Sequence, residues 1–509
     1  MVFSHLSFSF KKWIALAGLT CGVSMLFLDS TVLPVATPNI QESLLISNSG
    51  IIWVINAYFL ATATLVLAAG KIADMVGYRR IFSFGMFIFA FASALGGLAT
   101  SGFWLIIARF CQGIGGAMMG PASWSIILDI FPVKERGKAL GFLIGVSSIF
   151  LSLGPSIGGF ITEYLSWHWI FWVNVPIAAL GIFLVLSSVP KTDLSEESFD
   201  IPGFITFSGG VACLVIALMQ GRQWGWTSPV IITLFVGSVV FFFLLYVTDR
   251  YAKHPFIDFK LYKDHIYFGG SAIVFLVQFL VMISIFWPIF FQKALHFTPL
   301  EAGSFTLLST IPVIFVGPFS GWLHDRFGPK LPILTGFFLC TVAFAWFAFF
   351  LQKGSAAYLI PGLFLLGMSL ALVMTPNSTS ALSTLPQRKK GLGSGMFYSA
   401  RFTGATLGLA LFGALITNLR HSIFAKDLAS NPATAELDPH IFWGLLVDSP
   451  TVEALINTLP FETKLLVSKV FLQSYEKAFT YAHLFAAVVS VVAFFIAYRT
   501  YRNYVKPSQ

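Results

Sequence analysis

Two charged side chains lie inside long apolar stretches of the sequence, where an unpaired charge is costly. Asp29 lies 16 residues past Trp13 in the run 13–33. At about 1.5 Å per residue it would lie about 24 Å along a membrane helix, in the outer third of the bilayer. A carboxyl group at this depth is suited to carrying a proton. The alternative is an interfacial carboxylate near the end of the helix, next to Pro34.

Arg109 is the second such charge, in the run 104–129. It lies five residues past Trp104, and this places it at about the same depth as Asp29. A buried arginine keeps its proton, so it can hold or repel a proton on a nearby acid without titrating itself. We therefore interpret Asp29 and Arg109 as proton-coupling residues. The alternative is a structural arginine that binds backbone carbonyl groups.

A charged turn occurs twice in the chain. Gly70-Lys-Ile-Ala-Asp74-Met-Val-Gly77-Tyr-Arg79-Arg80 recurs 251 residues later as Gly321-Trp-Leu-His-Asp325-Arg326-Phe-Gly328. Glycine permits a tight turn, and an aspartate at a helix terminus can bridge helix ends. The constant offset indicates an internal duplication, which is a common way to build a transporter. We predict that these turns bridge helix ends, and the resemblance described below implies a gating role for their residues: Gly70, Asp74, Gly77, Arg79, Arg80, Gly321, Asp325, Arg326 and Gly328. The alternative is a solvated loop that only sets topology.

The run 139–162 is rich in glycine and contains one proline. Small residues let helix backbones approach closely, and proline permits a bend. A rocking hinge and ordinary tight packing are both compatible with this pattern. The residues concerned are Gly145, Gly154, Pro155, Gly158 and Gly159.

Several polar or aromatic groups within apolar runs are candidates to line a substrate cavity, although each alone is more often a packing residue. Arg401 stands out because no acidic residue lies inside a run of the second half. It can attract an anionic substrate group or bond to backbone carbonyls. The candidates are Asn56, Gln112, Gln278, Trp287, Asn377 and Arg401.

Composition excludes most other functions. The 509 residues are 57% hydrophobic and only 10% charged, with a mean hydropathy of +0.82, which is typical of a polytopic membrane protein. The net charge of +9 lies mostly in short loops, so we reject nucleic-acid binding. The four cysteines and nine histidines show no ligand spacing, and no Gly-Lys-Ser/Thr follows the glycine pairs. We expect no metal, no cofactor and no enzymatic activity.

The apolar runs predict an all-α membrane protein with fourteen transmembrane helices. The offset of 251 maps helices 1–6 onto helices 9–14, which gives two six-helix bundles with helices 7 and 8 as an inserted hairpin. The predicted units are an N-terminal bundle over 1–189, the insert with its connectors over 190–265, and a C-terminal bundle over 266–509. The last two spans are expected at 392–419 and 479–498, separated by an outer segment over 420–478.

Most of the 31 lysines and arginines fall on one side of this topology, so both termini are predicted to be cytoplasmic. Segment 420–478 has an apolar spacing near 463–479 that hints at an amphipathic helix. A folded cap and a recognition element are both compatible with it.

These motifs resemble the major facilitator superfamily, and within it the fourteen-helix drug:proton antiporter branch. Gly70–Arg80 is similar to its loop between helices 2 and 3, and Arg109–Pro121 to its helix 4 motif. Gly145 through Gly159 is similar to the antiporter motif of helix 5. Further similar segments are Leu28–Ile40, Trp167–Pro176 and Asp200–Gly203. The match covers most of residues 13–220, and the second half matches by topology and the repeated turn.

The resemblance implies alternating access driven by the proton gradient, in a bacterial inner membrane, with export of amphipathic small molecules such as drugs. It implies that Asp29 and Arg109 couple protons, that the helix 5 motif favours export, and that a periplasmic adaptor protein is a partner. His168 departs from the family's usual arginine, and helices 9–14 lack the acid of members that handle dications. This favours a lipophilic, neutral or anionic substrate. The competing hypotheses are an uptake symporter, a siderophore or metabolite exporter, and a non-transporting sensor or scaffold.

Overall fold

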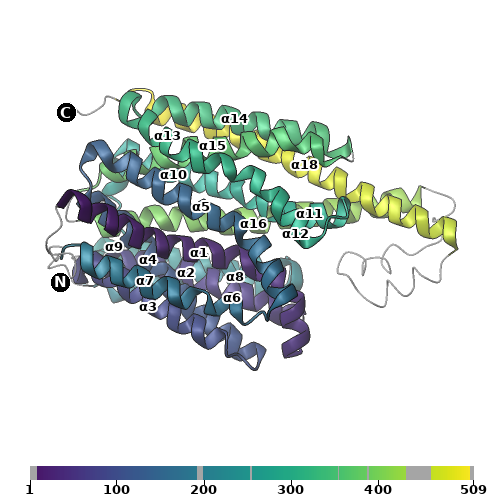
Figure 1. Ribbon diagram of the computed structural model, residues 1–509, viewed down its shortest axis with the longest axis horizontal. Coiled ribbons are helices and arrows are strands. Elements are labelled where there is room, and N and C mark those ends of the chain that lie inside the picture. Colours follow the sequence, from purple (N-terminus) through teal and green to yellow (C-terminus); the bar gives the residue numbers. More distant parts are fainter. Residues whose placement is uncertain are drawn as a thin grey trace.

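The computed structural model describes residues 8–46, 48–191, 199–252, 255–353, 355–386, 389–430 and 460–504. The described residues are almost entirely helical and contain no strand (Figure 1). Fourteen of their helical segments are long and apolar enough to cross a membrane. The predicted all-α fold with two six-helix bundles and an inserted hairpin is confirmed.

The N-terminal bundle contains six spans, the last of which is broken into two helices. Helix α1 packs on α5 and α7, and α4 packs on α2 and α3. The break follows Trp172, and Asn174 begins the second piece. The helices are α1 (Phe8–Leu44), α2 (Asn48–Val76), α3 (Tyr78–Gly96), α4 (Gly102–Ile130), α5 (Val133–Tyr164), α6 (Trp169–Trp172) and α7 (Asn174–Ser188).

The inserted hairpin consists of α8 (Ile201–Trp224) and α9 (Pro229–Tyr251), which pack on each other. Helix α8 also contacts both α2 and α16, so the hairpin lies beside the interface between the bundles. The Ser208 hydroxyl donates to the Thr64 carbonyl on α2 at 3.0 Å. Helix α9 exposes a row of apolar side chains, including Val236, Val239 and Phe243, as expected of a surface in contact with lipid.

The C-terminal bundle has interrupted helices in its ninth and tenth spans. Short 3₁₀ turns separate α10 from α11 and α12 from α13, with prolines at the first turns of α11, α12 and α13. The helices are α10 (His265–Val281), α11 (Trp287–Ala294), α12 (Pro299–Thr306), α13 (Ile311–Phe327), α14 (Lys330–Phe350), α15 (Ile360–Ser383), α16 (Lys390–Ala429) and α18 (Phe461–Tyr501). The 3₁₀ turns are Leu261–Lys263, Met282–Phe286, Leu307–Ser309, Leu351–Lys353 and Ala356–Leu359.

The last two spans are longer than the sequence predicted. Helix α16 continues to Ala429 and α18 begins at Phe461, so much of the expected outer segment 420–478 belongs to these two helices. They project together beyond the other helices at the right of Figure 1. A small apolar cluster of Phe424, Leu428 and Val467 joins them there. The expected amphipathic helix near 463–479 is the first part of α18, and residues 431–459 lie outside the described residues.

Both described ends of the chain lie at the end of the molecule opposite these projections, which we call the terminal end (Figure 1). Lys12 of α1 pairs with Glu135 at the start of α5 at 2.5 Å. Arg79 donates to the Val189 carbonyl at the end of α7 at 2.9 Å. The two repeated turns therefore belong to the terminal end.

Candidate functional site

Asp29 and Arg109 form an ion pair in the interior of the N-terminal bundle. The Arg109 Nη1 atom lies 2.5 Å from Asp29 Oδ2, and each side chain is only 1% exposed. Arg109 Nε donates to the Val54 carbonyl on α2 at 3.3 Å, and the guanidinium lies 4.7 Å from the centre of the Tyr58 ring. The two charges that the sequence placed at one depth are therefore in direct contact, desolvated and mutually neutralised.

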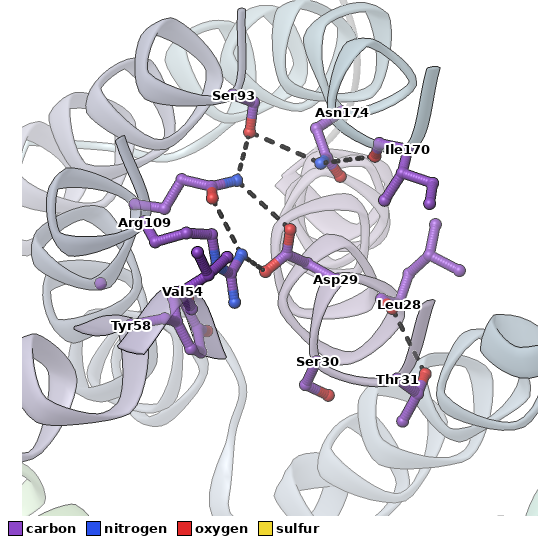
Figure 2. A network of polar contacts seen from close by, with 12 residues as sticks. Leu28, Asp29, Ser30, Thr31, Val54, Tyr58, Ser93, Arg109, Ile170 and Asn174 are labelled. Carbon is purple, nitrogen blue, oxygen red and sulfur yellow. Dashed lines mark hydrogen bonds and ion pairs between the residues drawn. The ribbon is translucent and has the colours of Figure 1, made fainter. Parts of the chain in front are cut away.

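A chain of polar side chains extends this pair across the bundle (Figure 2). Gln112 accepts from Arg109 Nη1 at 2.9 Å and donates to Asp29 Oδ1 at 3.2 Å. Its amide nitrogen also donates to Ser93 Oγ on α3 at 2.6 Å. Asn174, the first residue of α7, lies 3.5 Å from the same hydroxyl. We call Asp29, Arg109, Gln112, Ser93 and Asn174 the polar network.

The polar network joins five of the six spans of the N-terminal bundle, because α2 contributes the carbonyl of Val54. The carboxylate of Asp29 accepts from two neighbours that both lie on α4. A change in its protonation would alter both contacts at once. Gln112 was predicted only as a cavity-lining group, and Ser93 and Asn174 were not predicted, since a serine or asparagine in a helix carries no local signal of its partner.

The first repeated turn reaches across to the other bundle at the terminal end. The Asp74 carboxylate accepts from the backbone N–H groups of Gly391 and Leu392, both at 2.6 Å, at the first turn of α16. A carboxylate at a helix N-terminus satisfies backbone donors and complements the helix dipole. Tyr78 also donates to this carboxylate at 2.7 Å.

Glycines make this approach possible. A Cβ added to Gly70 would lie 2.5 Å from the Gly391 carbonyl oxygen, so a larger residue would push α2 and α16 apart. Gly77 and Gly328 have φ values of 101° and 80°, in the region that favours glycine. The repeated glycines thus serve a close helix contact and a turn at matching positions in both halves.

The second repeated turn also crosses to the other bundle, but with different polar contacts. Gly321 on α13 faces the backbone of Gly137 on α5, and the Asp325 carboxylate lies beside the same glycine. Asp325 contacts the His324 ring at 3.1 Å, and that ring reaches Ser380 at 3.0 Å. The two turns are therefore related in position and different in chemistry.

The arginines of the repeated turns do not form a common cluster. Arg79 binds the end of α7, and Arg326 lies over the rings of Trp322 and Phe327 on its own helix. Arg80 is exposed at the surface.

Helices α4 and α16 add further polar contacts that the sequence did not predict. Lys390 pairs with Asp129 at 2.7 Å, and Ser125 donates to Ser394 at 3.3 Å. The Trp124 indole donates to the Tyr398 hydroxyl. We call these contacts, with those of Asp74, the terminal gate: Asp74, Trp124, Ser125, Asp129, Lys390, Gly391, Leu392, Ser394 and Tyr398. The terminal end is closed in this conformation.

The glycine-rich part of α5 lies between the two bundles. Gly154 and Gly158 face Thr31 and Val32 of α1, where a Cβ would clash. On the other side, Gly145 lies against α13 and Pro155 against Gly303 of α12. No atom lies within 4 Å of a Cβ placed on Gly159. Helix α5 thus contacts both α1, which carries Asp29, and the opposite bundle. A rocking hinge and ordinary tight packing both require such contacts.

The remaining cavity candidates fall in different places. Arg401 Nε donates to Gln278 at 2.9 Å, and this pair lies near Phe27 of the N-terminal bundle. Asn56 faces Gln220 of the inserted hairpin rather than the C-terminal bundle. Both amide atoms of Gln220 lack a hydrogen-bond partner among the described residues.

Trp287 and Asn377 do not lie at the interface between the bundles. Trp287 is 1% exposed and packs against Phe290, Phe347 and His483 in the core of the C-terminal bundle. Asn377 is equally buried, donates to the Gly270 carbonyl and accepts from Tyr501. The structure thus places both side chains in contacts within the C-terminal bundle. These helices are apolar on all sides, so the sequence does not reveal which side faces the partner bundle.

Comparison with known proteins matches this architecture to one family. Residues 19–409 match the model of the Major Facilitator Superfamily. The multidrug resistance protein Stp of Mycobacterium tuberculosis is 31% identical over 86% of this chain and 81% of its own length. The tetracenomycin C resistance and export protein of Streptomyces glaucescens is 30% identical over 95% and 91%. The proton:xylose symporter XylE has the same fold, with a TM-score of 0.62, 14% identity and 95% of both chains covered.

Proposed function

The chain belongs to the major facilitator superfamily, a family of transporters and not of enzymes, and from this we propose that it exports amphipathic small molecules in exchange for protons. The family membership supports a substrate path between the two bundles, opened alternately to each side of the membrane. The resistance and export proteins among its relatives support export as the direction.

The Asp29–Arg109 pair is the observation that carries proton coupling. A carboxylate that is 1% exposed inside a membrane protein accepts hydrogen bonds from one arginine and one glutamine. Protonation of Asp29 would release Arg109 and Gln112 from their acceptor, and deprotonation would restore both contacts. Because Asp29 lies on α1, which packs on α5, this change reaches the helix that contacts the opposite bundle.

The terminal end is proposed to face the cytoplasm of a bacterial cell, in its plasma membrane, because the basic residues gather there. Closure of the terminal gate then corresponds to a path closed on the cytoplasmic side. The proposed partners are the lipid bilayer, the amphipathic substrate and a periplasmic adaptor. The projecting ends of α16 and α18 are the described part that reaches furthest toward such an adaptor.

The test uses everted membrane vesicles with an imposed inside-acid gradient. Lipophilic cations, anions and neutral compounds are added, and proton release is followed with a pH-sensitive dye. We expect release with at least one compound, and its loss in Asp29→Asn with unchanged protein in the membrane. Glu42→Gln is the matched control, since Glu42 is an exposed carboxylate on the same helix.

Full proton release in Asp29→Asn would contradict the coupling role of this residue. Substrate accumulation that is independent of the gradient would contradict proton-coupled export altogether.

A further inference from the structure

Arg401 is a charge in the middle of the membrane region that no carboxylate among the described residues neutralises. It lies 11 residues past the start of α16 at Lys390, or about 16 Å along a helix that begins at the terminal end. This is about half of the hydrocarbon thickness of a bilayer. A charged side chain at that depth is costly and marks a functional site by default.

The surroundings of Arg401 hold the side chain in place but do not compensate its charge. Its Nε donates to Gln278 on α10 at 2.9 Å. The guanidinium lies 5.6 Å from the ring centre of Tyr398 and 5.8 Å from that of Phe27. Among the described residues no carboxylate lies within ion-pair distance of it. The described polar contacts of the guanidinium are therefore made to neutral groups, the Gln278 amide and the Tyr398 hydroxyl, which leaves its charge for an anionic ligand to neutralise.

Arg109 provides the internal comparison. Both arginines lie within spans, but Arg109 is 1% exposed and paired with Asp29, whereas Arg401 is half-buried and has no acidic partner in the described part of the chain. Because the Asp29–Arg109 pair is neutral as a unit, the positive charge of Arg401 is the uncompensated charge near mid-membrane between the described parts of the two bundles. It lies next to Phe27, two residues before Asp29 on the same helix.

We propose that Arg401, positioned by Gln278 and Tyr398, binds the anionic group of the substrate, and that the substrate is an amphipathic monoanion. A carboxylate or sulfonate would accept from the terminal nitrogens of Arg401, while its apolar part packs against Phe27. The site touches both bundles, because Phe27 lies on α1 and Arg401 on α16. Binding would therefore bridge the interface next to the coupling residue. This proposal rests on the transport function proposed above.

Tyr398 bounds the proposed anion site on the side of the terminal end. It is 5% exposed, and its hydroxyl accepts from the Trp124 indole across the interface. The tyrosine belongs to the terminal gate, so the anion site lies directly above the closed end. Opening of the gate would move the ring that packs beside Arg401.

The test measures binding without a proton gradient, so it does not depend on coupling. The purified full chain in phosphatidylcholine nanodiscs is titrated with pyrenebutyrate and with a pyrenylbutyl-trimethylammonium cation, and empty nanodiscs are subtracted. We expect the anion to bind at least tenfold more tightly than the cation. Arg401→Gln should weaken anion binding about tenfold or more and leave cation binding unchanged, because a charge-assisted hydrogen bond is lost.

Two further variants separate ligand binding from a structural role. Arg401→Lys keeps the charge and should keep a preference for the anion. Gln278→Leu removes the contact that positions Arg401 but not the charge, so anion binding should weaken by less than in Arg401→Gln while a preference for the anion remains. Equal binding of both probes by the wild type, or an unchanged preference in Arg401→Gln with a normal melting temperature, would overturn the proposal.

Lipid is the other source of an amphipathic anion. If phosphatidylglycerol in the nanodiscs abolishes pyrenebutyrate binding and vesicles show no pyrenebutyrate flux, the site holds a lipid headgroup and the substrate proposal is overturned. Anion-selective binding without proton release in vesicles would retain the site and reject proton coupling. Proton release that is driven by the cation and unaffected by Arg401→Gln would retain proton coupling and reject the anion site.

Discussion

At the scale of single residues, two arginines inside membrane spans have different electrostatic surroundings. Arg109 has a carboxylate, an amide and a backbone carbonyl as acceptors, and Arg401 has one amide. Removing one partner of a buried ion pair leaves an uncompensated charge that destabilises the protein. A charge at an interface that has no acidic partner can instead be neutralised by a bound ligand. On this difference we propose proton coupling for the first arginine and substrate binding for the second.

The buried pair predicts a strongly non-additive pair of substitutions. Arg109→Gln leaves the Asp29 carboxylate without its cation and should destabilise the protein by about 3–5 kcal/mol. Adding Asp29→Asn removes the remaining charge and should recover most of that loss. The melting temperature in detergent measures both variants. A double variant that is less stable than Arg109→Gln would contradict this account of the network.

Some of these residues could be predicted from sequence and others could not. Asp29 and Arg109 were identifiable because a charge within an apolar run is rare and depth follows from helix rise. Ser93 and Asn174 complete the network, but small polar residues are common in membrane helices. Arg401 was recognised as unusual, whereas its contact with Gln278 required the packing of α10 on α16.

At the scale of elements, both copies of the turn lie against the opposite bundle, and their described polar contacts differ. Asp74 accepts from two N–H groups of α16, while Asp325 contacts the His324 ring and lies beside Gly137. The duplication was visible because turn residues are constrained by backbone geometry. The partners across the interface were not, since they lie more than 300 residues apart in the first turn.

The terminal gate predicts that Asp74→Ala favours the open terminal end. Loss of two charge-assisted hydrogen bonds should shift the equilibrium about tenfold. Ser125→Cys with Ser394→Cys reports closure by disulfide formation, since the two hydroxyl oxygens are 3.3 Å apart. The assay requires replacement of Cys21, Cys111, Cys213 and Cys340. An unchanged cross-linking rate in Asp74→Ala would rule out Asp74 as a closing contact.

The projecting ends of α16 and α18 form a second, smaller packing unit. Their apolar cluster contains Leu428, which is fully buried against Val467 and Val470, and it is separate from the core of the bundle. Leu428→Asp should expose this pair of helix ends to protease while the melting temperature of the protein changes little. Glu462→Gln on the same projection is the control. Leu411→Asp is not used, because Leu411 faces lipid. Global loss of stability in Leu428→Asp would show that the projection is not an independent unit.

At the scale of the whole molecule, the inserted hairpin joins the two bundles through its connector at the terminal end. Lys71 of α2 donates to the Pro255 carbonyl at 2.8 Å, and Asp258 pairs with Lys389 just before α16 at 2.5 Å. Phe256 is anchored between them by backbone contacts to Asp200 and Asp249. Residues 255–258 thus contact both sides of the terminal gate, and we predict that they contribute to its closure.

The Asp258–Lys389 pair of the connector is predicted to make a small contribution to closure of the terminal gate, which high salt abolishes. Asp258→Asn should lower the cross-linking rate of the Ser125→Cys and Ser394→Cys pair by about twofold or less, because Lys389 is 36% exposed and the pair is screened. At about 1 M salt this difference should vanish, while the effect of Asp74→Ala should persist because its contacts are buried. Equal salt sensitivity of both variants would contradict this distinction.

Helix α16 carries three of the features described above along its length. Its first turn is held by Asp74, its middle carries Arg401, and its far end projects from the bundle. With 40 residues it is about 60 Å long. A tilt of about 6° about its centre would displace the first turn by about 3 Å, enough to break hydrogen bonds of 2.6 Å. The projection is therefore a lever arm: a binder that pulls sideways on residues near Ala429 would exert torque on the gate at the opposite face of the membrane.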